Sequence, residues 1–273
     1  MNRTYLTLVR REFWEHRQLW IAPAASAAFL LLTAIAGVLF APGRVRFDGV
    51  SFDASPPPVP HFTERMMLFA TLGMASVILI AASVTVSIYL LDCLYAERKD
   101  RSILFWKSLP VSDRDTVLVK FGVAMAVVPA GVFLLQIVTN LLLTGVTAMA
   151  ARQHPAWLEA WTLSTWISAQ AQFAGIILVT LLWYAPVAAW CMLASVFARR
   201  APLMFAVLPW AILTISERLV LGTANVWHFV GWRLSSTQAP LERLASPGLW
   251  IGLAVAAGML YVVIRLRRYR DDT

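Results

Sequence analysis

Charged residues are scarce in this chain of 273 residues. They form 14 % of the sequence, whereas soluble domains average about 25 %. Hydrophobic residues form 59 %. A chain with so little charge does not cover a water-facing surface in the usual way, which argues against an ordinary soluble domain. The composition therefore indicates a protein of the lipid bilayer.

Motifs of metal and nucleophile chemistry are also missing. The sequence has two cysteines, Cys93 and Cys191, and four scattered histidines. No HExxH, CxxC or GxSxG motif occurs, so the sequence lacks the usual signatures of a zinc site and of a serine hydrolase. We therefore expect no metal, no cofactor and no catalytic residue on this chain.

The phosphate-binding loop GxxxxGK[ST] is absent as well. The three lysines, Lys99, Lys107 and Lys120, have none of the required glycines before them. If ATP drives this protein, its energy has to enter through another chain.

Long apolar runs dominate what remains. A helix needs roughly 20 mostly apolar residues to cross the hydrocarbon core at a rise of about 1.5 Å per residue. Six runs approach or exceed this length, at residues 19–40, 66–91, 117–150, 173–198, 202–221 and 249–264. We therefore expect an all-α, polytopic membrane protein with six transmembrane helices, forming a single transmembrane domain over residues 1–273.

The basic residues are distributed unevenly around these runs. Most of the 23 lysines and arginines lie in the amino-terminal arm, between the second and third runs, in the Arg199–Arg200 pair and in the carboxyl-terminal tail. By the positive-inside rule, both termini and the loop at residues 93–116 are cytoplasmic. This asymmetry, with contact to anionic lipid head groups, accounts for the net charge of +8 more simply than nucleic-acid binding does.

Two segments outside the runs have helical character. Residues 1–18 place Tyr5, Leu6, Val9 and Phe13 on one face, which predicts an amphipathic interfacial helix. The alternative is a plain extension of the first span. The segment between the last two spans is too polar to cross the membrane and predicts surface or re-entrant helices on the external side.

Several polar residues lie within the runs or at their ends. They are Ser76, Ser83, Ser87, Gln136, Asn140 and Glu217. Small and amide side chains at helical spacing either help helices to pack or line a route for cargo. Glu217 is open to two interpretations, a residue of the transport pathway or one partner of an interfacial ion pair with Arg218.

The loop at residues 93–116 combines many charges with an apolar centre at residues 103–106. Ser112 and Asp115 have capping-box spacing ahead of the third run, and Pro110 breaks the helix before it. That preceding helix is too short to be stable alone in water. The pattern predicts a short helix that docks on a partner protein, with flattening on the membrane as the alternative.

The string from Glu97 to Asp113, ERxxRS followed by ILFWKSLPVSD, resembles the signature of the membrane subunits of type-2 ABC exporters, bacterial permeases that pair with a separate ATPase. The resemblance implies a cytoplasmic coupling helix between spans 2 and 3 that sits in a cleft of the ATPase. The residues it assigns to this coupling are Glu97, Arg98, Asp100, Arg101, Phe105, Trp106, Lys107, Leu109 and Pro110.

The same resemblance implies the partners and the location. It predicts two ABC ATPase subunits that hold ATP and Mg, a second copy of the permease or a related permease chain, and the bacterial cytoplasmic membrane. The chain itself is then a permease subunit and not an enzyme. An ATP-independent secondary transporter and a membrane-embedded enzyme are the alternatives, and an amphipathic or lipid-like cargo fits the composition.

Overall fold

The computed structural model describes residues 2–40, 62–100, 111–150, 162–234 and 240–269. Every secondary-structure element in these residues is a helix, which confirms the all-α prediction. Six helices are long and apolar enough to cross a membrane: Gln18–Phe40, Thr71–Lys99, Asp113–Val146, Leu163–Phe197, Pro202–Leu221 and Pro247–Tyr269. Their length and composition indicate a multi-pass membrane protein, as predicted from the sequence.

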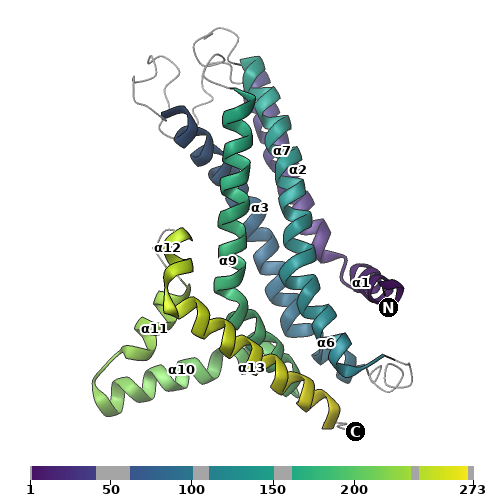
Figure 1. Ribbon diagram of the computed structural model, residues 1–273, viewed down its shortest axis with the longest axis vertical. Coiled ribbons are helices and arrows are strands. Elements are labelled where there is room, and N and C mark those ends of the chain that lie inside the picture. Colours follow the sequence, from purple (N-terminus) through teal and green to yellow (C-terminus); the bar gives the residue numbers. More distant parts are fainter. Residues whose placement is uncertain (1, 41–61, 101–110, 151–161, 235–239, 270–273) are drawn as a thin grey trace. The chain divides into compact units, whose positions relative to one another are not determined.

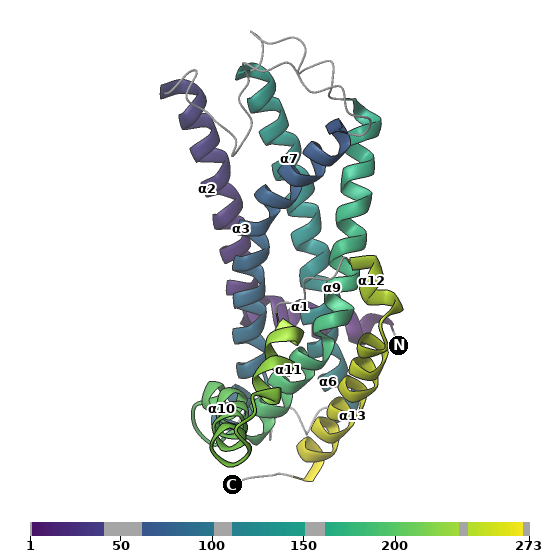
Figure 2. The same ribbon diagram turned by 90° about the vertical axis from the view of Figure 1, so that its left-hand side faces the viewer.

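The described helices follow one another along the chain (Figures 1 and 2). They are α1 (Asn2–Glu15), α2 (Gln18–Phe40), α3 (Phe62–Asp92), α4 (Tyr95–Lys99), α6 (Asp113–Gly122), the π-helical turn η1 (Val123–Val127), α7 (Val128–Ala150), α9 (Leu163–Phe197), α10 (Pro202–Leu221), α11 (Asn225–Leu234), α12 (Pro240–Ala245) and α13 (Pro247–Tyr269).

The chain forms two compact units. Unit 1 contains Met1–His16, Val86–Ala126 and Leu178–Thr273, and unit 2 contains Arg17–Thr85 and Val127–Ile177. Helices α3 and α9 and the continuous run from α6 to α7 pass from one unit into the other. The prediction of a single transmembrane domain over the whole chain stays a prediction.

Unit 2 is held together by close helix packing. Helix α2 runs along α7 (Figure 1). Gly131 makes this approach possible, because a Cβ at that position would lie 2.7 Å from the ring of Trp20. On α7 and α9, the rings of Phe133 and Phe173 are in contact, with centroids 6.1 Å apart.

Unit 1 has its apolar core between α9 and α13. Ala185 and Ala189 of α9 pack against Ala256 of α13, and Trp183 packs against Leu249. Small side chains at these positions let two helices approach closely, which is the usual basis of helix association in membranes. Helix α11 packs against α10, and α12 lies at the start of α13 (Figure 2).

Two features of the long helices differ from those expected. Helix α9 begins at Leu163, ten residues before the expected span, because the polar side chains near its start find partners on α7. The π-helical turn η1 interrupts the third long helix just before Pro129. Since Pro129 has no N–H to donate to the preceding turn, the regular hydrogen-bond ladder is disturbed at this point.

The amino-terminal helix is separate from the first span, as the sequence predicts, since α1 ends at Glu15 and α2 begins at Gln18. Within unit 1 it buries Glu12, which is 2 % exposed, and leaves Leu6 of the apolar face 68 % exposed. An apolar face left open by the protein is what an interfacial helix presents to lipid. The location of α1 at the membrane interface stays a prediction.

Candidate functional site

The first residue of the ERxxRS motif is buried among cations of unit 1. Glu97, on α4, is 6 % exposed. Its Oε2 atom lies 2.8 Å from Nη1 of Arg267 on α13, and its Oε1 atom lies 3.3 Å from Nζ of Lys120 on α6. Arg11 of α1 is further away, at 3.8 Å. The carboxylate therefore lies between three other elements of this unit.

A second buried carboxylate extends this arrangement. Nζ of Lys120 donates to Oε1 of Glu12 at 2.8 Å, and the hydroxyl of Tyr89 donates to Oε2 of Glu12 at 2.8 Å. We call Glu12, Glu97, Lys120 and Arg267 the buried charge cluster. It joins α1, α4, α6 and α13 within unit 1.

The charges in this cluster balance one another. An unpaired charge inside a protein costs several kcal/mol, whereas a paired and hydrogen-bonded one is tolerated. Burial opposes ionisation of Glu12, but Lys120 and the hydrogen bonds from Lys120 and Tyr89 outweigh it, so its pKa lies below the usual value. Separating the four elements would leave these charges without partners. The positions of the four elements therefore depend on one another.

Arg98 and Ser195 attach α4 to the end of α9. Nη2 of Arg98 donates to the backbone oxygens of Ser195 at 2.6 Å and Ala198 at 2.8 Å. Ser195 lies in the last turn of α9 and Ala198 directly follows its last residue, where carbonyls have no partner inside the helix. In return, the hydroxyl of Ser195 accepts from the backbone N–H groups of Leu94 at 3.2 Å and Tyr95 at 3.0 Å, at the start of α4.

Ser112 is the N-cap of α6, which confirms the N-cap half of the capping-box spacing. The hydroxyl of Ser112 accepts from the backbone N–H of Asp115 at 3.0 Å and donates to its carboxylate at 2.7 Å. The hydroxyl of Tyr5 on α1 also donates to this carboxylate, at 2.9 Å.

Of the predicted coupling residues, Asp100 is exposed at the end of α4. Six others lie outside the described residues: Arg101, Phe105, Trp106, Lys107, Leu109 and Pro110. The contact of the whole set with an ATPase stays a prediction.

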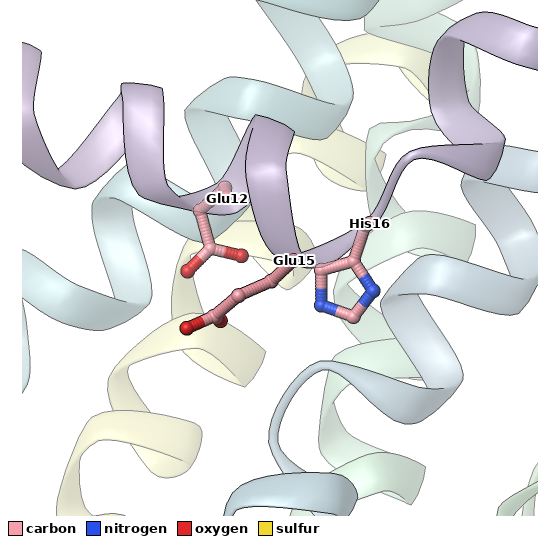
Figure 3. Close-up of side chains that lie close together, drawn as sticks. All are labelled: Glu12, Glu15 and His16. Carbon is pink, nitrogen blue, oxygen red and sulfur yellow. The ribbon is translucent and has the colours of Figure 1, made fainter.

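Three side chains at the end of α1 have the donor types of a metal site (Figure 3). Ligand atoms of Glu12, Glu15 and His16 lie within 4.8 Å of one another. However, Glu12 is paired with Lys120 at 2.8 Å, and Glu15 is paired with Nε of Arg11 at 2.6 Å. A cation would have to displace both pairs, so these residues are better explained as parts of the ion-pair network.

The predicted amide pair on α7 lies in unit 2. Oδ1 of Asn140 accepts from Nε1 of Trp166 at 2.7 Å and from Nε2 of Gln170 at 3.2 Å, both on α9. Asn140 thus links two helices, in agreement with the packing alternative. Gln136 is 2 % exposed, and no described residue offers a hydrogen-bond partner to either of its amide atoms.

The three serines of α3 lie on an exposed face. Ser76 donates to the backbone oxygen of Gly73 at 2.6 Å, and Ser83 donates to that of Ile80 at 3.0 Å. Ser87 is exposed as well. The structure therefore does not bury this face among the described helices of the chain.

Glu217 closes the turn between α10 and α11. Its carboxylate accepts from the hydroxyl of Thr223 at 2.6 Å and from the backbone N–H groups of Asn225 at 2.8 Å and Val226 at 2.7 Å. The carboxylate thus satisfies donors at the start of α11, where a negative charge is favourable. Both interpretations of Glu217, a pathway residue and an interfacial ion pair with Arg218, stay predictions.

Sequence reasoning missed four residues that hold α4 in place, Glu12, Lys120, Ser195 and Arg267. A weak signal existed for Lys120, because a lysine inside an apolar run needs a partner. Ser195 and Arg267 carried no such signal, since a serine in a span and an arginine in a basic tail are both ordinary.

Comparison of the chain with known proteins gave no match to a family model, to a curated protein or to a solved structure.

Proposed function

We propose that this chain is the membrane subunit of an ATP-driven exporter of the type-2 ABC class, located in the bacterial cytoplasmic membrane with both termini inside. The observation that carries the proposal is the motif at residues 97–113 together with the position of its first residues. Glu97 lies in the buried charge cluster, and Arg98 binds the last turn of α9.

This arrangement gives a route for mechanical force. A partner ATPase that grips residues 101–110 would pull on α4, which directly precedes them. Through Glu97 the displacement reaches α1, α6 and α13, and through Arg98 it reaches α9. Packed helices of this kind move as nearly rigid bodies. In this proposal two copies of the chain, or two related chains, respond to two ATPase subunits and open a path between them.

Within this mechanism the motif residues have different tasks. Glu97 and Arg98 turn toward their own chain and transmit the movement. The aromatic residues Phe105 and Trp106 dock on the partner and receive it. The ATP and Mg belong to the partner, and this chain performs no hydrolysis.

The test is copurification of an ABC ATPase with the full-length chain in nanodiscs. The wild type is compared with the Phe105→Ala/Trp106→Ala double variant and with Trp250→Ala, a matched control at an exposed tryptophan on α13. We expect the wild type and Trp250→Ala to retain ATPase activity and the double variant to lose it. Failure of the wild type to retain an ATPase, or solute movement by the purified chain alone, would overturn the proposal.

A labelling experiment tests the orientation. Single cysteines are placed at positions 55 and 105 in a Cys93→Ala/Cys191→Ala background, and intact cells are treated with a membrane-impermeant maleimide. We expect position 55 to react and position 105 to react only after lysis. The reverse pattern contradicts a cytoplasmic coupling loop.

A further inference from the structure

Most polar side chains in the spans of unit 2 are satisfied by their own helix. The hydroxyls of Ser26, Thr33, Thr85, Thr139 and Thr144 each donate to a backbone oxygen three or four residues earlier. This local bonding is the usual way in which serine and threonine are accommodated in apolar helices. These hydroxyls therefore have little hydrogen-bonding capacity left for a ligand.

The amides between α7 and α9 are different. A glutamine amide carries two donors and an acceptor, which is more than one bond to a backbone oxygen satisfies. Oε1 of Gln170 and both amide atoms of Gln136 are buried, and none of them has a hydrogen-bond partner among the described residues. Gln170 is 6 % exposed and Gln136 is 2 % exposed.

These atoms lie along one interface. On α7, Phe133, Gln136 and Asn140 share a face, because residues three and four apart are neighbours on a helix. Asn140 contacts Gln170 at one level, and Phe133 contacts Phe173 at the next. Gln136 falls between these two levels, which brings the unpartnered amide atoms of Gln136 and Gln170 to the same stretch of the interface.

A buried amide without a partner is costly, and such groups in native proteins usually mark a position that a water or a ligand fills. The residues at 18–40, 71–85, 127–146 and 163–177, which make up the spans of unit 2, contain no Asp, Glu, Lys or Arg. A charged ligand group would therefore have no counter-ion there. A neutral group that both donates and accepts hydrogen bonds, such as a primary amide or a hydroxyl, fits these atoms. They are the donor Nε2 of Gln136 and the acceptors Oε1 of Gln136 and Oε1 of Gln170.

We propose that Gln136 and Gln170, oriented by Asn140, form a binding position for the uncharged hydrogen-bonding group of an otherwise apolar transported molecule. This assignment rests on the proposed function, because it names the cargo chemistry of the same protein. Asn140 and Trp166 hold the two helices in register, and Gln136 makes the recognition contact.

The test is photolabelling of the full-length chain in phosphatidylcholine nanodiscs. The probe is dodecanamide with a diazirine in the middle of its chain, and the comparison probe is the N,N-dimethyl amide, which has no N–H donor. We expect the first probe to label residues 133–143 and 166–173, and excess unlabelled dodecanamide to compete. The comparison probe should label lipid-facing side chains instead.

Two variants separate recognition from folding. Gln136→Met keeps the length of the side chain and removes the amide, and we expect it to lower the competed labelling about five- to ten-fold, as loss of one hydrogen bond would. Gln172→Met removes an exposed amide from α9, the helix that carries Gln170, and should leave labelling unchanged. A thermal melt of Gln136→Met at or above that of the wild type shows that the variant folds.

Equal labelling by both probes, or unchanged labelling of Gln136→Met, overturns the site and leaves ordered water as the partner of these amides. The experiment needs no ATPase, so its outcome is independent of the copurification test. If an ATPase copurifies but labelling is unselective, only the site fails. If labelling is selective but no ATPase is retained, the site stands and the ATP-driven mechanism fails.

Discussion

The carboxylate of Glu97 and the guanidinium of Arg267 lie 2.8 Å apart, although 170 residues separate them in the sequence. Only 7 % and 4 % of their side chains are exposed. The pair connects the first motif residue to the end of the last helix. Both charges are buried and need compensation, which each gives the other. Lys120 also lies near Glu97, and Nε of Arg267 donates to Oδ1 of Asp113 at 3.0 Å.

Removing either charge alone should destabilise unit 1. We expect Glu97→Gln and Arg267→Met each to lower the free energy of unfolding by about 3 kcal/mol, since each leaves a buried charge with less compensation. The double variant should lose clearly less free energy of unfolding than the two single variants lose together. SDS-induced unfolding in mixed micelles measures this coupling, with Arg265→Met as a control because Arg265 lies exposed on the same helix. Strictly additive losses would contradict a coupled pair.

The sequence predicted the helices well, because each depends on a local signal. Six apolar runs of sufficient length gave six long helices, and the Ser112–Asp115 spacing gave a capped start. The buried charge cluster could not be predicted in the same way. The positive-inside rule treats Lys120 and Arg267 as cations at the ends of spans, and it has no term for a carboxylate that is distant in the sequence.

The amides show a similar limit. The spacing of Gln136 and Asn140 places both on one face of α7, which the sequence reveals. Their partners belong to α9, and the start of that helix was expected at residue 173. The contacts of Trp166 and Gln170 with Asn140 therefore lay outside the span that the sequence indicated.

Ser195 gives a prediction about the start of α4. Ser195→Ala removes the acceptor of two backbone N–H groups, those of Leu94 and Tyr95. We expect a loss of about 1–2 kcal/mol and faster amide hydrogen exchange at residues 94–99. Ser76→Ala is the matched control, because the Ser76 hydroxyl is exposed and bonds only within α3 among the described residues. Unchanged exchange at residues 94–99 would argue against this capping role.

His16 should make the stability dependent on pH. Its ring packs edge-on against Tyr89, with centroids 4.8 Å apart, and burial lowers its pKa below the usual 6.5. The unfolded chain therefore binds a proton more readily than the folded one. Stability is fully present above pH 6.5 and is lost as the pH falls through this value toward the folded pKa.

Unfolding midpoints measured between about pH 8 and about pH 5.5 check this expectation. His16→Asn should make the unfolding midpoint less dependent on pH across this range, because it removes the titrating ring. Glu12 does not interfere, since its pKa is lowered from 4.5 and it titrates below the range. An equal slope in the wild type and in His16→Asn would show that another group is responsible.

Arg233 fixes α11 to the core of unit 1. It is 8 % exposed, and it donates from Nη2 to the backbone oxygen of Trp183 at 2.6 Å and from Nη1 to that of Gly248 at 3.1 Å. Its guanidinium also lies 4.3 Å from the ring centroid of Trp183. In return, Nε1 of Trp183 donates to the backbone oxygen of Arg233 at 2.9 Å.

Gly252 leaves the space that this guanidinium occupies, because a Cβ there would overlap Nη2 of Arg233. We expect Gly252→Ala to cost about 1–3 kcal/mol, since it forces the guanidinium away from its acceptors. Gly258→Ala on the same helix meets no atom within 4 Å and should be neutral or stabilising by up to about 1 kcal/mol. Thermal unfolding of both variants, with hydrogen exchange of residues 225–234, measures the difference. Adding Arg233→Met to Gly252→Ala should cost little more, because the alanine has already broken the contacts of Arg233. If Gly252→Ala and Gly258→Ala change the thermal unfolding equally, the space at Gly252 is not what holds Arg233 in position.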